Sequence, residues 1–369
     1  MRRAAQVSRP PVTVAPVIVG GGPAGAAAGI ALLQAGVRAV LLERLDVPGD
    51  TICGGFLSWR TVERIAALGI DPDSLGGHRV SDVALYVGGK EQGATLPAPA
   101  LGVSRQRLDS ILLDAAQGRG VDVRRGQTVR ALGDADLTLA DGNIVPWDSL
   151  FLATGKSDLR GVSRPRGGTG GDPELGLRLR LAPSPALTRM VGGRIELHLF
   201  DRGYIGLVMQ EDGSVNACMA VRKSRLADAG GTPARLFARL ADEMPALADR
   251  LADMPADPQI DAIGNVPYGW RATDTRTGLF RLGDQAAVIP SVAGEGVGIA
   301  LASAQSAVAH WLSDGAKGAH PHQRAFARHV ARPVALAGLV KGLGSRPALA
   351  RALLALPGAA QIVARLTRV

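Results

Sequence analysis

A glycine-rich turn between a short apolar strand and a helix constrains this chain more than any other feature. Gly20 permits a tight turn after the strand 17–19, Gly22 lets the backbone approach a pyrophosphate, and Gly25 lets the helix pack closely against the strand. The helix expected over 23–34 then presents unpaired N–H groups and a positive dipole end to the phosphates. Glu43 follows the next strand, at a spacing suited to hydrogen bonds with an unphosphorylated adenosine ribose. The pattern predicts a dinucleotide-binding βαβ unit.

A second glycine-rich segment lies far along the chain. The strand expected over 279–282 leads into Gly283 and Asp284, and Pro290, Gly294, Gly296 and Gly298 follow. A nucleotide-binding fold built from both ends of the chain is a more specific prediction than the one that a single glycine motif allows.

Length and composition exclude several classes of protein. The 369 residues, with 46% hydrophobic content, are enough for two lobes with a large core. We expect neither a membrane span nor a signal peptide, because no apolar run is long enough and the leader 1–16 is not apolar. Cys53 and Cys218 are the only cysteines and show no metal-ligand spacing, so we expect no metal, no disulfide framework and a cytoplasmic location.

The positive charge is concentrated in one region. Residues 315–369 hold nine Lys or Arg and no Asp or Glu, so the net charge of +9 lies there and the remainder of the chain is balanced. The region is also apolar, which leaves two interpretations of 316–369: peripheral contact with the inner face of a membrane, or helices that cap the fold. Aromatic residues make up 4% of the chain and are not interleaved with basic ones, so we expect no nucleic-acid binding.

The periodicity changes along the chain. Before residue 164, short apolar strands alternate with helices, whereas alternating, turn-bounded strands over 176–221 predict an antiparallel sheet with one buried face. The predicted fold class is α/β, a Rossmann-like nucleotide domain interrupted by an antiparallel-sheet domain and followed by a helical C-terminal tail. Its boundaries are 12–80, 101–163 and 272–315 for the nucleotide domain, 81–100 and 164–271 for the sheet domain, and 316–369 for the basic helical region.

Together these motifs resemble the FAD-dependent oxidoreductases of the aromatic-hydroxylase superfamily, most closely its geranylgeranyl-reductase-like branch. The resemblance rests on the first glycine fingerprint with Glu43, on Cys53-Gly54, on the helix opened by Arg105, on Ala153 to Gly155 and on the segment 283–298. It implies that Asp284 bonds a ribityl hydroxyl, that Gly296 and Val297 face the pyrimidine edge of the flavin, and that Arg105 contacts the cofactor. The full set of cofactor contacts that it implies is Gly20, Gly22, Pro23, Ala24, Gly25, Glu43, Arg44, Cys53, Gly54, Arg105, Val129, Ala153, Thr154, Gly155, Gly283, Asp284, Pro290, Gly294, Gly296, Val297 and Gly298.

The electron donor is less well defined. Thr154 stands where aromatic hydroxylases usually carry the aspartate of an Asp-Gly motif, which argues against direct reduction by a nicotinamide. No second fingerprint with a preceding strand is present. The donor is therefore either NAD(P)H bound transiently without a Rossmann site or a separate redox protein.

Two residues are candidates for catalysis. Cys53 lies beside the flavin in reductases that this chain resembles, but it is equally interpreted as a small packing residue ahead of two glycines. Tyr268 precedes the second glycine segment and is either a pocket residue or a turn aromatic.

Three functions follow from these features. The favoured one is an FAD-dependent oxidoreductase that transfers hydride or electrons to or from a lipophilic small molecule, such as an isoprenoid, polyketide or quinone. The second is a monooxygenase that forms a flavin hydroperoxide. The third is a flavin-bound redox or docking protein at a membrane surface, without turnover.

Overall fold

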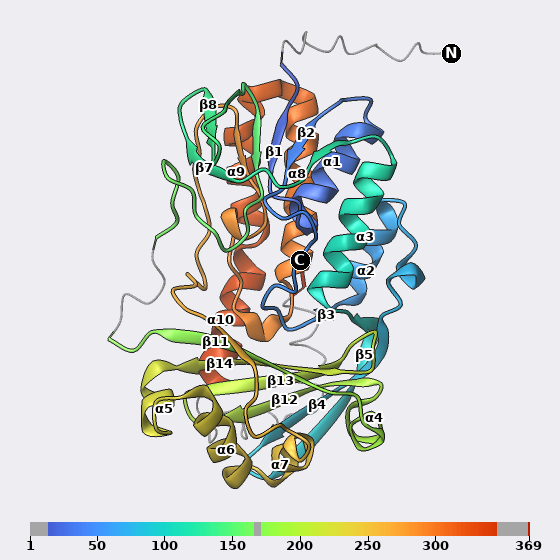
Figure 1. Ribbon diagram of the computed structural model, residues 1–369, viewed down its shortest axis with the longest axis vertical. Helices are drawn as coiled ribbons and strands as arrows, with labels where there is room; N and C mark the ends of the chain where they lie inside the picture. Colours follow the sequence, from blue (N-terminus) through green and yellow to red (C-terminus); the bar gives the residue numbers. More distant parts are fainter. Residues whose placement is uncertain (1–13, 166–170, 345–367) are drawn as a thin grey trace.

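A nucleotide half lies above a broad sheet in the computed structural model of the protein, which describes residues 14–165, 171–344 and 368–369 (Figure 1). The upper half consists of helices around a small parallel sheet. Helices α5, α6 and α7 cover the opposite face of the broad sheet (Figure 1). The structure thus confirms a mixed α/β fold with a Rossmann-like half, a separate sheet half and a helical C-terminal region.

The nucleotide half is built on a five-stranded parallel sheet in the order β16-β10-β1-β2-β6. Its strands are β1 (Val17–Val19), β2 (Val40–Leu42), β6 (Asp122–Arg124), β10 (Leu150–Leu152) and β16 (Leu279–Arg281). Helices α3 (Arg105–Gly118) and α8 (Gly296–Asp314) both pack against α1 (Pro23–Gln34) beside it. Both glycine-rich segments therefore lie at carboxyl ends of strands in one sheet, where open α/β sheets bind their ligands.

A small antiparallel sheet extends this half. Strands β7 (Val129–Leu132), β8 (Asp136–Leu139) and β9 (Ile144–Pro146) form it, in the order β7-β8-β9. Their buried side chains form one apolar cluster with those of β1 and β10. The small sheet thereby supports the edge of the nucleotide half near Val129.

The lower half is an eight-stranded sheet in the order β15-β11-β14-β13-β12-β4-β5-β3. The strands are β3 (Phe56–Leu57), β4 (His78–Val87), β5 (Lys90–Gly102), β11 (Glu174–Leu181), β12 (Arg194–Phe200), β13 (Gly203–Met209), β14 (Val215–Arg222) and β15 (Ile260–Ile263). The strands over 176–221 pair antiparallel as predicted, whereas β4 and β12 pair in parallel. These two strands come from segments far apart in the sequence, so no hairpin imposes an antiparallel direction on them.

Short helices and 3-10 turns complete both halves. They are α2 (Trp59–Ala67), α4 (Pro185–Val191), α5 (Lys223–Asp228), α6 (Pro233–Glu243) and α7 (Pro245–Leu251), with the 3-10 turns η1 (Pro72–Leu75), η2 (Gly283–Gln285), η3 (Ser291–Ala293) and η4 (Gly315–Gly318). Buried residues of α4, α6 and α7 pack on β11, β13 and β14 from the side away from the nucleotide half.

The basic region begins with two helices, α9 (Ala319–His329) and α10 (Ala331–Gly344). Phe326, Val330, Val334 and Ala337 bury their side chains against residues of the second glycine segment and of α8. This part of the region caps the fold, whereas the predicted tail residues 345–367 lie outside the described part of the chain. Within the described residues, no helix is both long enough and apolar enough to cross a membrane.

A buried histidine makes the fold sensitive to acid. His322 is fully buried, and burial lowers its pKa to about 4. In the unfolded chain His322 binds a proton at a higher pH, about 6.5. The folded state therefore keeps its full stability above pH ~6.5 and loses free energy of unfolding as the pH falls toward 4, by an amount on the order of 3 kcal/mol. We expect the free energy of unfolding, measured with urea from pH 7 to 4, to fall less steeply in His322→Gln than in the wild type. An equal pH dependence in the two proteins would show that His322 is not the source of this acid sensitivity.

Candidate active site

The turn between β1 and α1 has the geometry that its glycines predict. Gly20 has a φ of +103°, and a Cβ on it would lie 2.4 Å from the carbonyl oxygen of Ala153. A Cβ on Gly25 would lie 1.9 Å from the carbonyl oxygen of Gly20. Beyond Gly22 the space is open, since the nearest atom to its Cβ position is Arg105 Nη2 at 3.6 Å. The backbone at Gly22 is therefore exposed to an approaching ligand.

Glu43 shapes the same turn. Its Oε2 accepts a hydrogen bond from Gly21 N at 2.6 Å, and its Oε1 accepts one from Leu45 N at 2.9 Å. The carboxylate joins the end of β2 to the glycine turn and lines the cleft beside it. It holds the turn in position, and its contact with a ribose stays a prediction.

A cleft of about 340 Å³ opens at this edge of the parallel sheet. Ten of the residues predicted to contact the cofactor line it: Gly20, Gly22, Glu43, Arg44, Arg105, Val129, Ala153, Thr154, Gly155 and Asp284. Pro23, Ala24 and Gly25 are buried beneath it in the first turn of α1. The structure thus brings distant segments of the sequence together around one cavity.

Two cations of the cleft, Arg105 and Lys156, are paired with carboxylates. Arg105 forms a two-point ion pair with Asp109, at 2.9 Å from Nε and 2.7 Å from Nη2. Burial opposes the charge of Arg105, but Asp109 outweighs it and raises the pKa of the guanidinium above its ordinary value. Lys156, which also lines the cleft, lies 3.6 Å from Asp284. A permanent cation, a helix N-terminus and a glycine turn without side chains together fit a diphosphate.

Sequence reasoning missed several residues of the cleft. Gln127, Thr128, Lys156 and Asp158 line it together with Asp109. Lys156 and Asp158 directly follow the turn Ala153–Gly155, so their position after a strand end was an available signal. Gln127 and Thr128 lie before β7 and carry no motif.

The second glycine segment lies beneath and beside the cleft. Gly283 has a φ of +54° and packs against Ala24, so the two glycine-rich segments are in contact. Gly294 has a φ of +64° beside the Phe56 ring, and α8 begins at Gly296. A Cβ on Gly296 would meet no atom within 4 Å. The start of α8 is therefore open on the side of Gly296, and contact of this turn with a flavin stays a prediction. Val297 and Gly298 continue the helix within the core.

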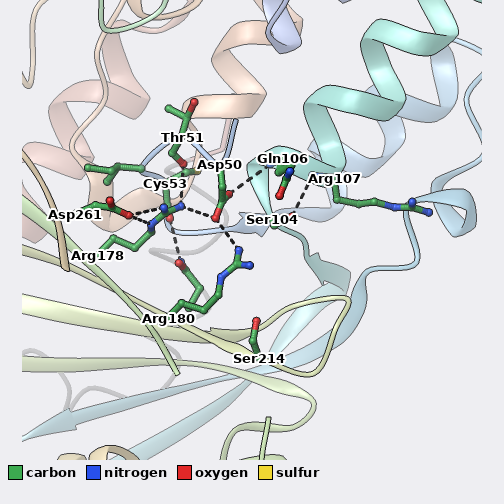
Figure 2. Close-up of polar contacts among 12 residues, drawn as sticks. Asp50, Thr51, Cys53, Ser104, Gln106, Arg107, Arg178, Arg180, Ser214 and Asp261 are labelled. Carbon is green, nitrogen blue, oxygen red and sulfur yellow. Dashed lines mark hydrogen bonds and ion pairs between the residues drawn. The ribbon is translucent and has the colours of Figure 1, made fainter. Parts of the chain in front are cut away.

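Cys53 and Gly54 lie at the junction of the two halves. Asn216 on β14 donates hydrogen bonds from Nδ2 to the carbonyl oxygens of Cys53 at 3.0 Å and Gly54 at 2.9 Å. Figure 2 shows the preceding loop directed toward the sheet, with Asp50 between Arg178 and Arg180. Asp50 pairs with each arginine at 2.7 Å. The loop that carries Cys53 is thus fastened to the sheet half at several points.

The remaining candidates differ in their surroundings. Removal of the Cys218 thiol from water raises its pKa to about 12, so this thiol stays protonated at neutral pH. Tyr268 lines a separate cavity of about 230 Å³ together with Pro290, and Lys341 lies over its ring at 4.7 Å. Burial raises the pKa of the Tyr268 phenol well above its ordinary value. Within the described residues, no group of His, Cys, Asp and Glu is arranged to hold a metal ion.

Comparisons with known proteins relate parts of this chain to flavoproteins. Residues 12–139 match the family model described as FAD binding domain. Menaquinone reductase of Mycobacterium tuberculosis is 30% identical over 150 residues, which is 38% of this chain and 37% of that protein. Menaquinone reductase of Mycolicibacterium smegmatis is 31% identical over the same shares. The chain thus matches little more than a third of the length of these curated relatives.

Solved structures share the whole fold. The flavin-dependent brominase Bmp2 superposes with a TM-score of 0.75 at 17% identity, over 95% of this chain and 92% of that one. PqsL of P. aeruginosa, solved in complex with 2-aminobenzoylacetate, superposes with a TM-score of 0.72 at 14% identity, over 91% and 98% of the two chains. Residues 12–139 therefore match an FAD-binding family, and the chain as a whole shares its fold with flavin-dependent proteins.

Proposed function

We propose that the protein is an FAD-dependent oxidoreductase that transfers electrons to or from a lipophilic small molecule, of the isoprenoid or quinone class. The observation that supports it best is the apolar character of the sheet face that looks toward the flavin-contact segment. Leu85, Leu197, Leu199 and Tyr204 form one apolar cluster with Val292 of η3. The second glycine segment and the sheet thus share an apolar wall.

Strand register makes this face apolar over three neighbouring strands. Leu85 is opposite Leu197, and Leu199 is opposite both Val87 and Tyr204. Leu85 and Leu197 remain half-buried, so they offer apolar surface to a ligand. The Tyr204 hydroxyl donates a hydrogen bond to Ser291 Oγ at 2.5 Å, which satisfies the phenol.

The residues fit FAD in two places. The glycine turn, Glu43 and Arg105 would hold the adenosine diphosphate half, and Asp284 with the first turn of α8 would hold the ribityl chain and the ring. FAD bound there would supply two-electron chemistry. The residues of this chain would bind it, orient it and shield the substrate from water.

Cys53 is proposed as the thiol nearest the reaction. It lies on the fastened loop between the cleft and the sheet face, where its side chain is half-buried and its carbonyl oxygen is fixed by Asn216. A thiol in this position would deliver a proton to a reduced substrate. Cys218 is the control, because it is the other cysteine of the chain and lies within strand β14 rather than on this loop.

The decisive experiment records the visible spectrum of the purified protein and then excludes oxygen. We expect bound FAD, reoxidation of the dithionite-reduced protein by a menaquinone-type isoprenoid quinone, and a product that has gained two hydrogens. Cys53→Ala should keep FAD but lower this turnover at least tenfold, whereas Cys218→Ala should keep both. A colourless protein that FAD cannot reconstitute would overturn the proposal.

A monooxygenase is the second candidate, since PqsL, with which the chain shares its fold, is described as a probable FAD-dependent monooxygenase. Oxygen consumption matched by a product one oxygen atom heavier would favour it over the reductase. Addition of NADH and NADPH without oxygen also tests the donor. Rapid loss of the oxidised flavin spectrum would identify a nicotinamide as the donor and contradict the expectation drawn from Thr154.

A further inference from the structure

A buried carboxylate lies at the start of α8. Glu295 precedes the first residue of this helix, and its side chain is fully buried. Its Oε2 has no hydrogen-bond partner within the described part of the chain, and a Cβ on Gly298 would lie 2.3 Å from it. A buried carboxylate is costly unless a cation is close to it.

The neutralising cation comes from a residue 73 positions later in the chain. Arg368 donates from Nη1 to Glu295 Oε1, and it also donates from Nη1 to the carbonyl oxygen of Ala293 at 2.9 Å. Its guanidinium lies 5.2 Å from the centre of the Trp59 ring and 5.7 Å from that of Phe56. With a side chain that is 8% exposed, Arg368 makes a desolvated ion pair rather than a surface one.

This pair lies against the segment predicted to face the flavin. Ala293 and Glu295 flank Gly294, the left-handed residue that turns the chain into α8. Arg64 is a second cation whose field reaches Glu295, but its Nη1 donates a hydrogen bond to Gln305 Oε1 at 2.7 Å. Charge at this position acts directly on the helix end that would stabilise a reduced, anionic flavin.

We propose that Arg368 is a positioning residue of the flavin site, which neutralises Glu295 and fixes the turn 293–296 against the ring of FAD. The inference rests on the proposed binding of FAD. Without Arg368, the Glu295 carboxylate would repel the negative charge of reduced flavin and would be buried without its closest counter-ion. The reduced cofactor would lose more affinity than the oxidised one.

A double-mutant cycle tests this in the full chain, with Arg368→Met, Glu295→Gln and the combination. We expect Arg368→Met to weaken FAD binding about tenfold or more and to lower the flavin midpoint potential. Glu295→Gln should raise the potential, and the double variant should recover most of the loss in affinity because no charge is left buried. Arg368→Lys, which keeps the charge, should keep the potential close to that of the wild type.

Arg124→Met is the matched control, since Arg124 makes an exposed ion pair with Asp122 in the same half of the molecule. It should change neither affinity nor potential. Strictly additive effects of the two single changes would overturn the inference. A double variant that binds FAD as weakly as Arg368→Met, or unfolds as easily, would also overturn it. Absence of FAD from the wild type would instead defeat the proposed function. Urea unfolding of the four apo-proteins would then still measure the coupling of Glu295 with Arg368.

Discussion

Replacing Gly25 with alanine is expected to abolish retention of FAD and to destabilise the fold by about 3 kcal/mol or more. The added Cβ would lie 1.9 Å from the carbonyl oxygen of Gly20, a backbone atom that cannot rotate away. Helix α1 would have to move off β1, and the glycine turn would lose the shape that admits a pyrophosphate. Urea unfolding and the visible spectrum of the purified variant measure the two effects.

Gly118→Ala provides the matched control. Gly118 is the last residue of α3, and a Cβ on it would meet no atom within 4 Å. Alanine should be neutral there or stabilising by roughly 0.5–1 kcal/mol, because glycine loses more conformational freedom in a helix. If Gly25→Ala kept FAD and unfolded like Gly118→Ala, the close approach of helix and strand would not be required.

The second large effect is expected on the far side of the sheet, at Arg250. Its Nη2 donates to Glu196 Oε1 at 2.8 Å and its Nε to Glu196 Oε2 at 2.9 Å, where the carboxylate is fully buried. Burial raises the pKa of Glu196, but hydrogen bonds from His198 and Arg250 outweigh this and leave the pKa below its ordinary value. Arg250→Met should therefore lower the free energy of unfolding by about 3–5 kcal/mol, because it leaves the buried Glu196 carboxylate with too few partners.

The same change tests how far the two halves are independent. Glu196→Gln combined with Arg250→Met should recover much of the lost stability. Arg239→Met is the control, because Arg239 forms an exposed pair with Glu243, and it should lower the free energy of unfolding by less than about 1 kcal/mol. Because this network lies on the sheet face away from the cleft, folded Arg250→Met should keep the FAD spectrum of the wild type. Equal costs for Arg239→Met and Arg250→Met would contradict the role of burial.

Local signals predicted the nucleotide half well. The helix expected over 23–34 is α1, residue for residue, because Pro23 fixes its first turn and glycines precede it. Strand β5 was not predicted, since Gly93, Pro97 and Pro99 interrupt its alternation. Helices α4 and α5 were missed as well, because each is about two turns long and has little periodicity to detect.

The residues of the candidate site were likewise predicted only where a local motif marks them. Residues that a glycine motif or a strand end marks, such as Gly20 and Asp284, lie around the cleft as expected, although their contacts with FAD remain predictions. Neither Gln127 nor Arg368, the partner of Glu295, could be predicted from the sequence, because their positions depend on how distant segments pack. The ion pair of Arg368 joins residues that no local pattern relates.

Strand β16 completes the parallel sheet by adding to β10, although most of the chain separates it from β1. Loop-closure entropy opposes such distant contacts until the intervening chain is ordered. During synthesis the eight-stranded sheet therefore has most of its strands before β16 leaves the ribosome. We expect the nucleotide cleft to close last, so that cofactor capture is a late event in the maturation of this protein.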